Sequence, residues 1–493
     1  MGKDKKIKDK KIKLWALVML IFVPTFGFGN IASNAVYLGP AAIPSWVIVS
    51  ILYFLPLCGI IAEMASANRD KEGGIYSWIN KSLGEKWAFV GTWTYFIGIL
   101  FYLQMVFSRI PVAASWAILG RNVFTDSNAY LLPILSIVIC IAMTYIATIG
   151  VSKFSKLADF GGQFTLGATV IFILMAIVGY FMGTPSATEF TVQNVIPDFN
   201  VSYFSTFSWL LFAVSGSEVA GTYIMQTENP KKTFPKAMII ATALIAFSYI
   251  LGSVAIQFIA SPEVLQKAGI QDAGYVVYYI LANNFGINGK VIVQVYAAIN
   301  LITSIAAYII WMESPIRAMF GEVPKGTFPS FLTNKRKDGT LVNALWTQCA
   351  ILVVLISIPL LGIGSINDFF KLLTDLSSLA VVVPYVVLIC AFISFRKHNK
   401  DLDFKFFKSD ALAYTVAGIA LVLSCAGFFG AGLQDIVGSS GKEAAILIIK
   451  TYGGPVILMA LGLVLRALSE KSYKNKIGKE DIEVEIVEEC ICE

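Results

Sequence analysis

Histidine is almost absent from this chain, which has 493 residues and a single histidine, His398. His398 lies in a polar stretch, so no apolar segment contains an imidazole. This absence argues against histidine-based metal sites and serine–histidine catalysis within those segments. The chain also lacks a Walker A motif and a paired-aspartate motif of the intramembrane-protease kind. We therefore expect neither an ATP-driven pump nor a membrane enzyme, and no catalytic residue, cofactor or metal.

Cysteine gives no sign of a zinc site or of a disulfide framework. Cysteines scattered through apolar segments usually behave as small hydrophobic residues, and five do so here: Cys58, Cys140, Cys349, Cys390 and Cys425. Cys490 and Cys492 stand close together near the C-terminus and could bind a metal. The acidic composition around them favours the alternative, two free thiols on a polar tail.

Charge is scarce, because only 14% of the residues are charged and 57% are hydrophobic, with a mean hydropathy of +0.72. These values lie far outside the range of soluble domains and predict an all-α integral membrane protein. A helix needs about 20 apolar residues to cross a bilayer. The sequence accordingly predicts twelve transmembrane helices, near residues 14–38, 43–66, 88–108, 130–150, 164–183, 204–226, 237–260, 291–312, 342–364, 372–395, 411–433 and 445–468.

Lysine and arginine are unevenly distributed between the loops. Seven lysines precede the first expected helix, and every second loop is basic. Because basic loops remain in the cytoplasm, we expect a protein of the cell membrane with both termini cytoplasmic. The net charge of +6 reflects this sidedness in the lipid bilayer and does not indicate a nucleic-acid partner. The expected parts are a basic N-terminus (1–13), a membrane domain (14–468) and an acidic tail (469–493).

Two of the expected helices are interrupted at their midpoints. The first reads Pro-Thr-Phe-Gly-Phe-Gly-Asn over residues 24–30, and the sixth reads Val-Ser-Gly-Ser-Glu over residues 214–218. Such residues leave backbone groups without partners, and these groups cannot face lipid. Breaks of this kind are tolerated where they line a cavity, and two in matching positions indicate a transporter's substrate site.

The position of the two breaks also predicts an internal repeat. Because they fall in the first and sixth helices, each half contains five helices, and an odd number inverts the second half. The predicted repeats cover about residues 14–183 and 204–395, and the two helices of residues 411–468 lie outside them.

The geometry of the breaks favours an amino acid as the ligand. The second half-helices would begin near Asn30 and Ser217 at the same depth, with free N–H groups that suit a carboxylate. The first half-helices would end in free carbonyl groups that suit an ammonium group. As an alternative, Gly27, Gly29 and Gly216 serve only tight helix packing. The polar side chains at the breaks favour a binding site.

Because the expected helices contain no histidine, any pH dependence would come from carboxylates such as Glu63, Glu218, Glu313 and Asp375, or from the substrate itself. Glu218 directly follows the second break. It is either a proton-coupling group or a structural cap of the broken helix, and both alternatives remain open.

Two basic residues near the ends of expected helices have alternatives of their own. Arg109 either snorkels to the membrane interface or faces inward, where it would attract acidic substrates. Arg317 follows Glu313 by one helical turn, which predicts a solvated ion pair.

Several sequence motifs carry a family likeness: Ala-Glu-Met at 62–64, Glu-Gly-Gly-Ile-Tyr-Ser-Trp at 72–78, Leu-Gly at 83–84, and Glu-Asn-Pro-Lys-Lys-Thr-Phe-Pro-Lys-Ala at 228–237. In these motifs the chain resembles the amino acid–polyamine–organocation (APC) transporter superfamily over about residues 12–470. It looks most similar to the bacterial glutamate/GABA antiporter branch, which includes exchangers of amino acids for decarboxylated amines. The resemblance implies the leucine-transporter-type fold, with a 5+5 inverted repeat and broken helices 1 and 6.

The resemblance also implies a set of substrate-binding residues. The backbone site matches Gly27, Phe28, Gly29, Asn30, Ile31, Val214, Ser215, Gly216 and Ser217; the side-chain pocket matches Gly98, Tyr102 and Met105; and the aromatic gates match Phe212 and Tyr308. Glu218 matches the acidic residue that follows the break in many members. Residues 27–32 depart from the usual Gly-Ser-Gly run. The long basic C-terminal plug of the glutamate/GABA antiporter is missing, which argues against its mode of pH gating.

We therefore expect a secondary active amino-acid transporter that works by alternating access. An antiporter is the favoured form, exchanging glutamate for GABA or an amino acid for an amine. Proton-coupled symport and uniport are the alternatives. An open facilitator pore is disfavoured by the bulk of Phe212 and Tyr308, and a transporter-like nutrient sensor by the lack of a signalling domain.

Overall fold

The computed structural model describes residues 11–69, 74–149, 155–320, 323–324, 326–361, 365–399, 402 and 404–491. These residues form helices and no strand, apart from one isolated β-bridge, which agrees with the predicted all-α class. The α-helices are α1 (Leu14–Thr25), α2 (Phe28–Leu38), α3 (Ala42–Val49), α4 (Leu55–Ala67), α5 (Ile75–Leu83), α6 (Glu85–Leu119), α7 (Leu131–Thr148), α8 (Ser155–Phe181), α9 (Val192–Val195), α10 (Val201–Ala213), α11 (Pro230–Ile259), α12 (Pro262–Asn284), α13 (Gly289–Phe320), α14 (Ser330–Thr333), α15 (Val342–Ser357), α16 (Ile366–His398), α17 (Asp410–Gly430), α18 (Leu433–Val437), α19 (Gly441–Ile448) and α20 (Gly454–Ile491). Short 3₁₀ and π-helical pieces connect them: η1 (Gly39–Ala41), η2 (Ser50–Phe54), η3 (Asp126–Asn128), η5 (Ser217–Gln226), η6 (Ile358–Leu361) and η7 (Ile449–Gly453).

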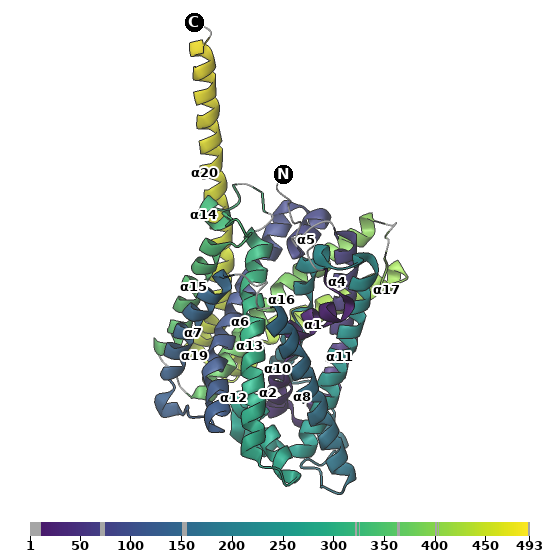
Figure 1. The fold of residues 1–493 in the computed structure, drawn as a ribbon. Helices are drawn as coiled ribbons and strands as arrows, with labels where there is room; N and C mark the ends of the chain where they lie inside the picture. Colours follow the sequence, from purple (N-terminus) through teal and green to yellow (C-terminus); the bar gives the residue numbers. More distant parts are fainter. Residues whose placement is uncertain are drawn as a thin grey trace, which may run out of the picture.

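The helices form an elongated bundle with two distinct ends (Figure 1). We call the end with α5, α14 and the projecting part of α20 the tail end, and the opposite end, with α12, the α12 end. α20 continues as a helix through the expected acidic tail to Ile491. α12 occupies the stretch between two expected transmembrane helices and is kinked at Gly269, whose φ is +73°.

Eight helical stretches within the described ranges are long and apolar enough to cross a membrane: Leu14–Ala67, Glu85–Leu119, Leu131–Thr148, Gly161–Phe181, Pro230–Ile259, Ile366–His398, Asp410–Gly430 and Gly441–Lys474. The first of them contains two of the twelve expected helices. Two more, Gly289–Ile305 and Val342–Ser357, are apolar but shorter. The sixth expected helix is divided at its break into pieces too short to count. The chain is thus a multi-pass membrane protein.

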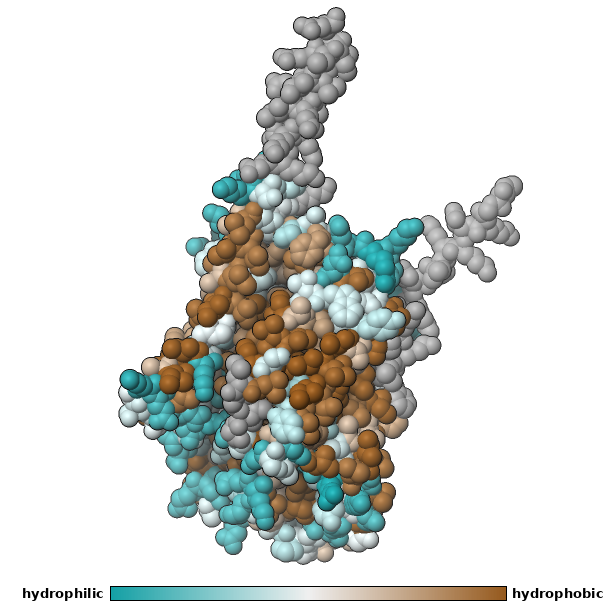
Figure 2. Space-filling model, turned by 90° about the vertical axis from the view of Figure 1, so that its left-hand side faces the viewer, coloured by the Kyte–Doolittle hydropathy of each residue, from teal (hydrophilic) through white to brown (hydrophobic). Residues whose placement is uncertain are grey.

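The outer surface is apolar in its middle and polar toward its ends, which matches the cross-section of a lipid bilayer. Figure 2 shows a hydrophobic area across the middle of one face, with hydrophilic residues toward its ends. Large apolar side chains stand exposed along α7, α15 and α20; Val138, Val354 and Ile457, for example, are more than half exposed. Lipid chains can cover such a surface, whereas water would make it costly.

α6 passes through the core and packs closely on α16. A Cβ atom at Gly98 in α6 would lie 3.0 Å from the carbonyl oxygen of Ala380 and 3.0 Å from the Cα of Val381. Glycine therefore allows these two helix backbones to approach each other, as small residues do in membrane bundles. This contact fixes the face that α6 turns toward the broken helices.

A buried ion cluster joins α4, α16 and the start of α17. Arg396 is fully buried and donates through Nε and Nη2 to the two carboxylate oxygens of Glu63, each at 2.8 Å. Its Nη1 donates to Asp410 at 2.9 Å, and the backbone N–H of Phe407 donates to Glu63 at 2.9 Å. Removing one partner of such a pair leaves an uncompensated buried charge.

We predict that Arg396→Met lowers the free energy of unfolding by about 3–5 kcal/mol, because Glu63 would stay buried without a cation. A thermal melt of the purified protein in detergent would show this as a clear fall in Tm. Arg336→Met is the matched control, because Arg336 and Asp338 form an exposed pair with side chains 44% and 48% exposed. Equal melting curves for the two variants would contradict a structural role of the cluster.

Candidate functional site

The first break is a two-residue gap between α1, which ends at Thr25, and α2, which begins at Phe28. The N–H of Gly27 donates to the hydroxyl of Tyr249 at 3.3 Å. That hydroxyl in turn donates to the carbonyl of Ala213 at 2.8 Å, with the carbonyl of Thr25 also within 3.1 Å. One phenol of α11 therefore links both broken helices.

The second break lies between α10, which ends at Ala213, and η5, which begins at Ser217. Gly216 has a φ of +122°, which side chains other than glycine rarely adopt. A Cβ atom there would lie 3.0 Å from the carbonyl oxygen of Pro24 and 3.0 Å from the ring of Trp311. Glycine is therefore required where the two breaks touch.

Glu218 and Tyr385 form hydrogen bonds with the backbone at the second break. The N–H of Gly216 is shared between Oε2 of Glu218, at 3.1 Å, and the hydroxyl of Tyr385, at 3.0 Å. Tyr385, from α16, donates to the same Oε2 at 2.6 Å. These are the contacts of the capping alternative for Glu218. Its role in proton coupling stays a prediction.

The two half-helix starts are consequently not equivalent, although the sequence led us to expect both to meet one ligand. α2 presents its first turn, with Phe28 and Gly29, where N–H groups have no intrahelical acceptor. At η5, the N–H of the N-cap residue Gly216 is occupied by Glu218 and Tyr385, as described above. Of the two starts, that of α2 borders open space.

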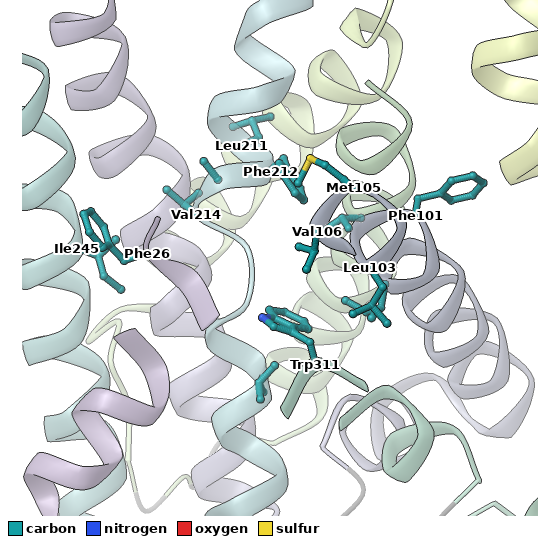
Figure 3. Packing of buried hydrophobic residues seen from close by; sticks show 14 of the residues in the cluster. Phe26, Phe101, Leu103, Met105, Val106, Leu211, Phe212, Val214, Ile245 and Trp311 are labelled. Carbon is teal, nitrogen blue, oxygen red and sulfur yellow. The ribbon is translucent and has the colours of Figure 1, made fainter. Parts of the chain in front are cut away.

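That space is a cavity of about 180 Å³ on the α12 side of the first break. Its walls come from the α1–α2 break, α6, α8, α10, α12, α13 and α16. Figure 3 shows Val106, Phe212 and Trp311 meeting there from α6, α10 and α13. Ile270 and Tyr275 of α12 also line it, so the cavity extends toward the α12 end.

Nine of the predicted site residues line this cavity: Gly27, Phe28, Gly29, Asn30, Tyr102, Met105, Phe212, Ser215 and Tyr308. The other predicted site residues do not line the cavity: Ile31, Gly98, Val214, Gly216, Ser217 and Glu218. The contacts explain two of these cases. Gly98 packs on α16, and Ser217 accepts a hydrogen bond from the thiol of Cys58.

Arg109 faces the cavity, which agrees with the inward-facing alternative. Its Nη1 lies 3.7 Å from the position that a Cβ atom on Gly29 would take. The guanidinium group therefore stands beside the start of α2.

The predicted pair of Glu313 and Arg317 forms, with Nη2 and Oε1 2.7 Å apart. Its expected solvation was wrong for one partner, because the Glu313 side chain is only 6% exposed whereas that of Arg317 is 39% exposed. The packing of α13 against its neighbours buries the carboxylate.

Residues that the sequence did not single out complete the site. Tyr249 and Tyr385 satisfy the backbone at the breaks, and Trp311 forms part of the cavity wall. A polar phenol in the middle of an apolar helix was the available signal for both tyrosines, since a buried hydroxyl needs a partner. Within the described ranges, no three histidine, cysteine or carboxylate side chains gather as metal ligands would.

The N-terminal segment makes a backbone contact with the chain just beyond η5. Ile12 pairs with Thr227, just beyond η5: the N–H of Ile12 donates to the carbonyl of Gln226 and that of Glu228 to the carbonyl of Ile12, each at 2.9 Å. The segment before α1 is thereby fastened to the end of the second broken helix.

Comparison with known proteins gives a consistent result. A family model described as amino acid permease matches residues 12–454. The chain is 29% identical to the aspartate/glutamate permease AcaP of Lactococcus lactis subsp. cremoris, over 94% of this chain and 97% of that protein. It is 24% identical to the glutamate/gamma-aminobutyrate antiporter of Lactococcus lactis subsp. lactis, over 86% of this chain and 84% of that protein.

A similar fold occurs among solved structures. The crystal structure of a mutant manganese transporter of Eremococcus coleocola superimposes with a TM-score of 0.57 at 11% identity. The match covers 96% of this chain and 97% of that one, so the likeness concerns the whole architecture.

We predict that Tyr249→Phe reduces uptake of a labelled amino acid by about fivefold to a hundredfold at equal protein level, since a buried polar group left unpaired costs about 1–3 kcal/mol. Tyr452→Phe is the control: its hydroxyl donates to the carbonyl of Ala431 at 3.2 Å, at the end of α17, and Tyr452 does not line the cavity. Uptake by Tyr249→Phe equal to that of the control would show that the linking hydroxyl is dispensable.

Proposed function

Because this chain belongs to the amino acid permease family, we propose that it is a secondary active amino-acid transporter of the cell membrane that exchanges one substrate for another. The main support is the cavity at the first break. It brings together the unpaired start of α2 and nine residues of the proposed binding site. The N–H groups suit a carboxylate, and an amino acid is a small ligand that carries one.

The proposed architecture is the leucine-transporter type, with twelve transmembrane helices. Residues of about 14–183 and 204–395 would form the inverted repeats, each opening with a broken helix, and residues 411–468 the last two helices. The breaks at Phe26–Gly27 and Val214–Gly216 support this arrangement because they occupy corresponding positions.

We place both termini in the cytoplasm, the basic segment 1–13 and the acidic tail 469–493 included, on the strength of the basic loops. The tail end is then the cytoplasmic end, and the cavity lies on its outer side. The pairing of Ile12 with Thr227 supports a state that is closed toward the cytoplasm. Alternating access would require this side to open and the α12 end to close.

Exchange is favoured over uniport because an empty site would leave backbone N–H groups without hydrogen-bond partners. With neither ligand nor water, N–H groups at the start of α2 that lack an intrahelical acceptor would be unpaired, which is costly in an apolar surrounding. To return empty, the carrier would pass through a conformation in which the site is closed on both sides, where these N–H groups would have no partner. Return with a bound counter-substrate would avoid that cost. Exchange of glutamate for GABA or of an amino acid for its amine fits this scheme. Proton symport through Glu218 is the second candidate.

We predict that an internal amino acid or amine accelerates uptake several-fold. The measurement is initial uptake of labelled glutamate and of other labelled amino acids into proteoliposomes that are either empty or loaded with one candidate solute. Equal rates in both would exclude obligatory exchange. No uptake with any amino acid would refute the proposed function.

We further predict that Glu218→Gln retains substrate binding but flattens the dependence of transport on pH. The carboxylate is only 2% exposed, and within the described ranges no cation forms a salt bridge with it. Glutamine keeps its shape and cannot ionise.

Glu263→Gln is the control for this measurement. Its hydrogen bond with Ser261 lowers the pKa of the exposed Glu263 carboxyl, which therefore stays ionised between about pH 5 and 8. An unchanged pH profile in Glu218→Gln would leave that residue with its structural role alone.

A further inference from the structure

The cavity wall is charged at one position only. Among its described residues there is no aspartate, glutamate, lysine or histidine, and Arg109 supplies the single ionised side chain. Arg109 projects from α6, and its buried Nε has no hydrogen-bond partner. Its Nη1 stands beside Gly29, at the start of α2.

Arg109 has no counter-charge. In the part of the chain that the structure describes, it forms neither a salt bridge nor a hydrogen bond. The titratable groups nearest to its charge are the phenols of Tyr102, Tyr275 and Tyr308, which are neutral at physiological pH. A guanidinium group held away from water without an anion is costly, and the cost is removed when a carboxylate pairs with it.

The charge of the ligand follows from this arrangement. A neutral zwitterion would bring one carboxylate and one ammonium group, so the cavity would remain positive after binding. The start of α2 already offers donors to the α-carboxylate. A second carboxylate, on the ligand's side chain, would pair with Arg109 and make the occupied cavity neutral. Cationic amines would meet an uncompensated like charge, so of the proposed counter-substrates this site favours those that keep a carboxylate, as GABA does.

We propose that Arg109 is the specificity-determining residue of this site and that it selects amino acids with an acidic side chain. The inference rests on the proposed function and names its substrate class. Guanidinium and carboxylate groups pair through two parallel hydrogen bonds, which gives direction as well as strength. An amide of the same shape offers one acceptor and places two donors against a cation. The site should therefore separate aspartate from asparagine and glutamate from glutamine.

The test is isothermal titration calorimetry of the purified protein with L-aspartate, L-glutamate, L-asparagine and L-glutamine. We expect the wild type to prefer each acid over its amide by about tenfold to a hundredfold, the range for a hydrogen bond to a charged group. Arg109→Met should reduce that ratio to near unity and leave the amide affinity within about threefold, since the α2 site is retained. Arg109→Lys should keep part of the preference, because it retains the charge but not the paired donors.

Arg121→Met is the matched control, because Arg121 is an exposed cation just beyond the same helix and does not line the cavity. It should leave the acid-to-amide ratio unchanged, and an equal loss in this variant would indicate general attraction of anions instead. Equal binding of acids and amides by the wild type would overturn the inference while the proposed function stands. Equal loss of acids and amides in Arg109→Met would assign Arg109 to the α-carboxylate and overturn it as well. A wild type that binds none of the four, and none of the other amino acids, would refute the proposed function itself.

Discussion

One hydroxyl group, that of Tyr249, holds the two interrupted helices together. It accepts from the N–H of Gly27 and donates to the carbonyl of Ala213, so each broken helix has one exposed backbone group satisfied by the same atom. The ring is fixed by stacking on Trp46, with centroids 4.1 Å apart. Because this hydroxyl contacts backbone groups of both breaks, the position of α11 determines how the breaks face each other. The cavity exists where this arrangement leaves α2 uncovered.

The two breaks both leave backbone N–H groups without helical partners, and the protein satisfies these groups differently at each break. At the second break, the exposed N–H of Gly216 is satisfied by the protein's own side chains. It donates to the carboxylate of Glu218, which also accepts a hydrogen bond from the hydroxyl of Tyr385. At the first, the phenol occupies the N–H of Gly27 but not the turn that follows. Positive potential from the start of α2 and the charge of Arg109 therefore add on one side of the cavity. Of the two interrupted helices, one therefore contributes a binding surface and the other a self-contained structural contact.

Local sequence was sufficient for some of this structure and insufficient for the rest. The breaks at residues 24–30 and 214–218 were predictable because glycine in an apolar span has a direct backbone consequence. The roles of Tyr249 and Tyr385 were not, since a mid-helix phenol reveals its partner only after the helices have packed. The direction of Arg109 was likewise left open, because the rotation of α6 is set by its contact with α16 at Gly98. Helix length alone does not give the number of spans, because the structure divides the sixth expected helix at its break and joins the first two into one apolar stretch.

The pairing of Ile12 with Thr227 gives the N-terminal segment a mechanical role. Two backbone hydrogen bonds contribute only about 1–3 kcal/mol together, which is comparable to the free energy that a ligand can redistribute between two conformations. A contact of that strength can favour one conformation of this end of the bundle and can still be released without unfolding the helices it joins.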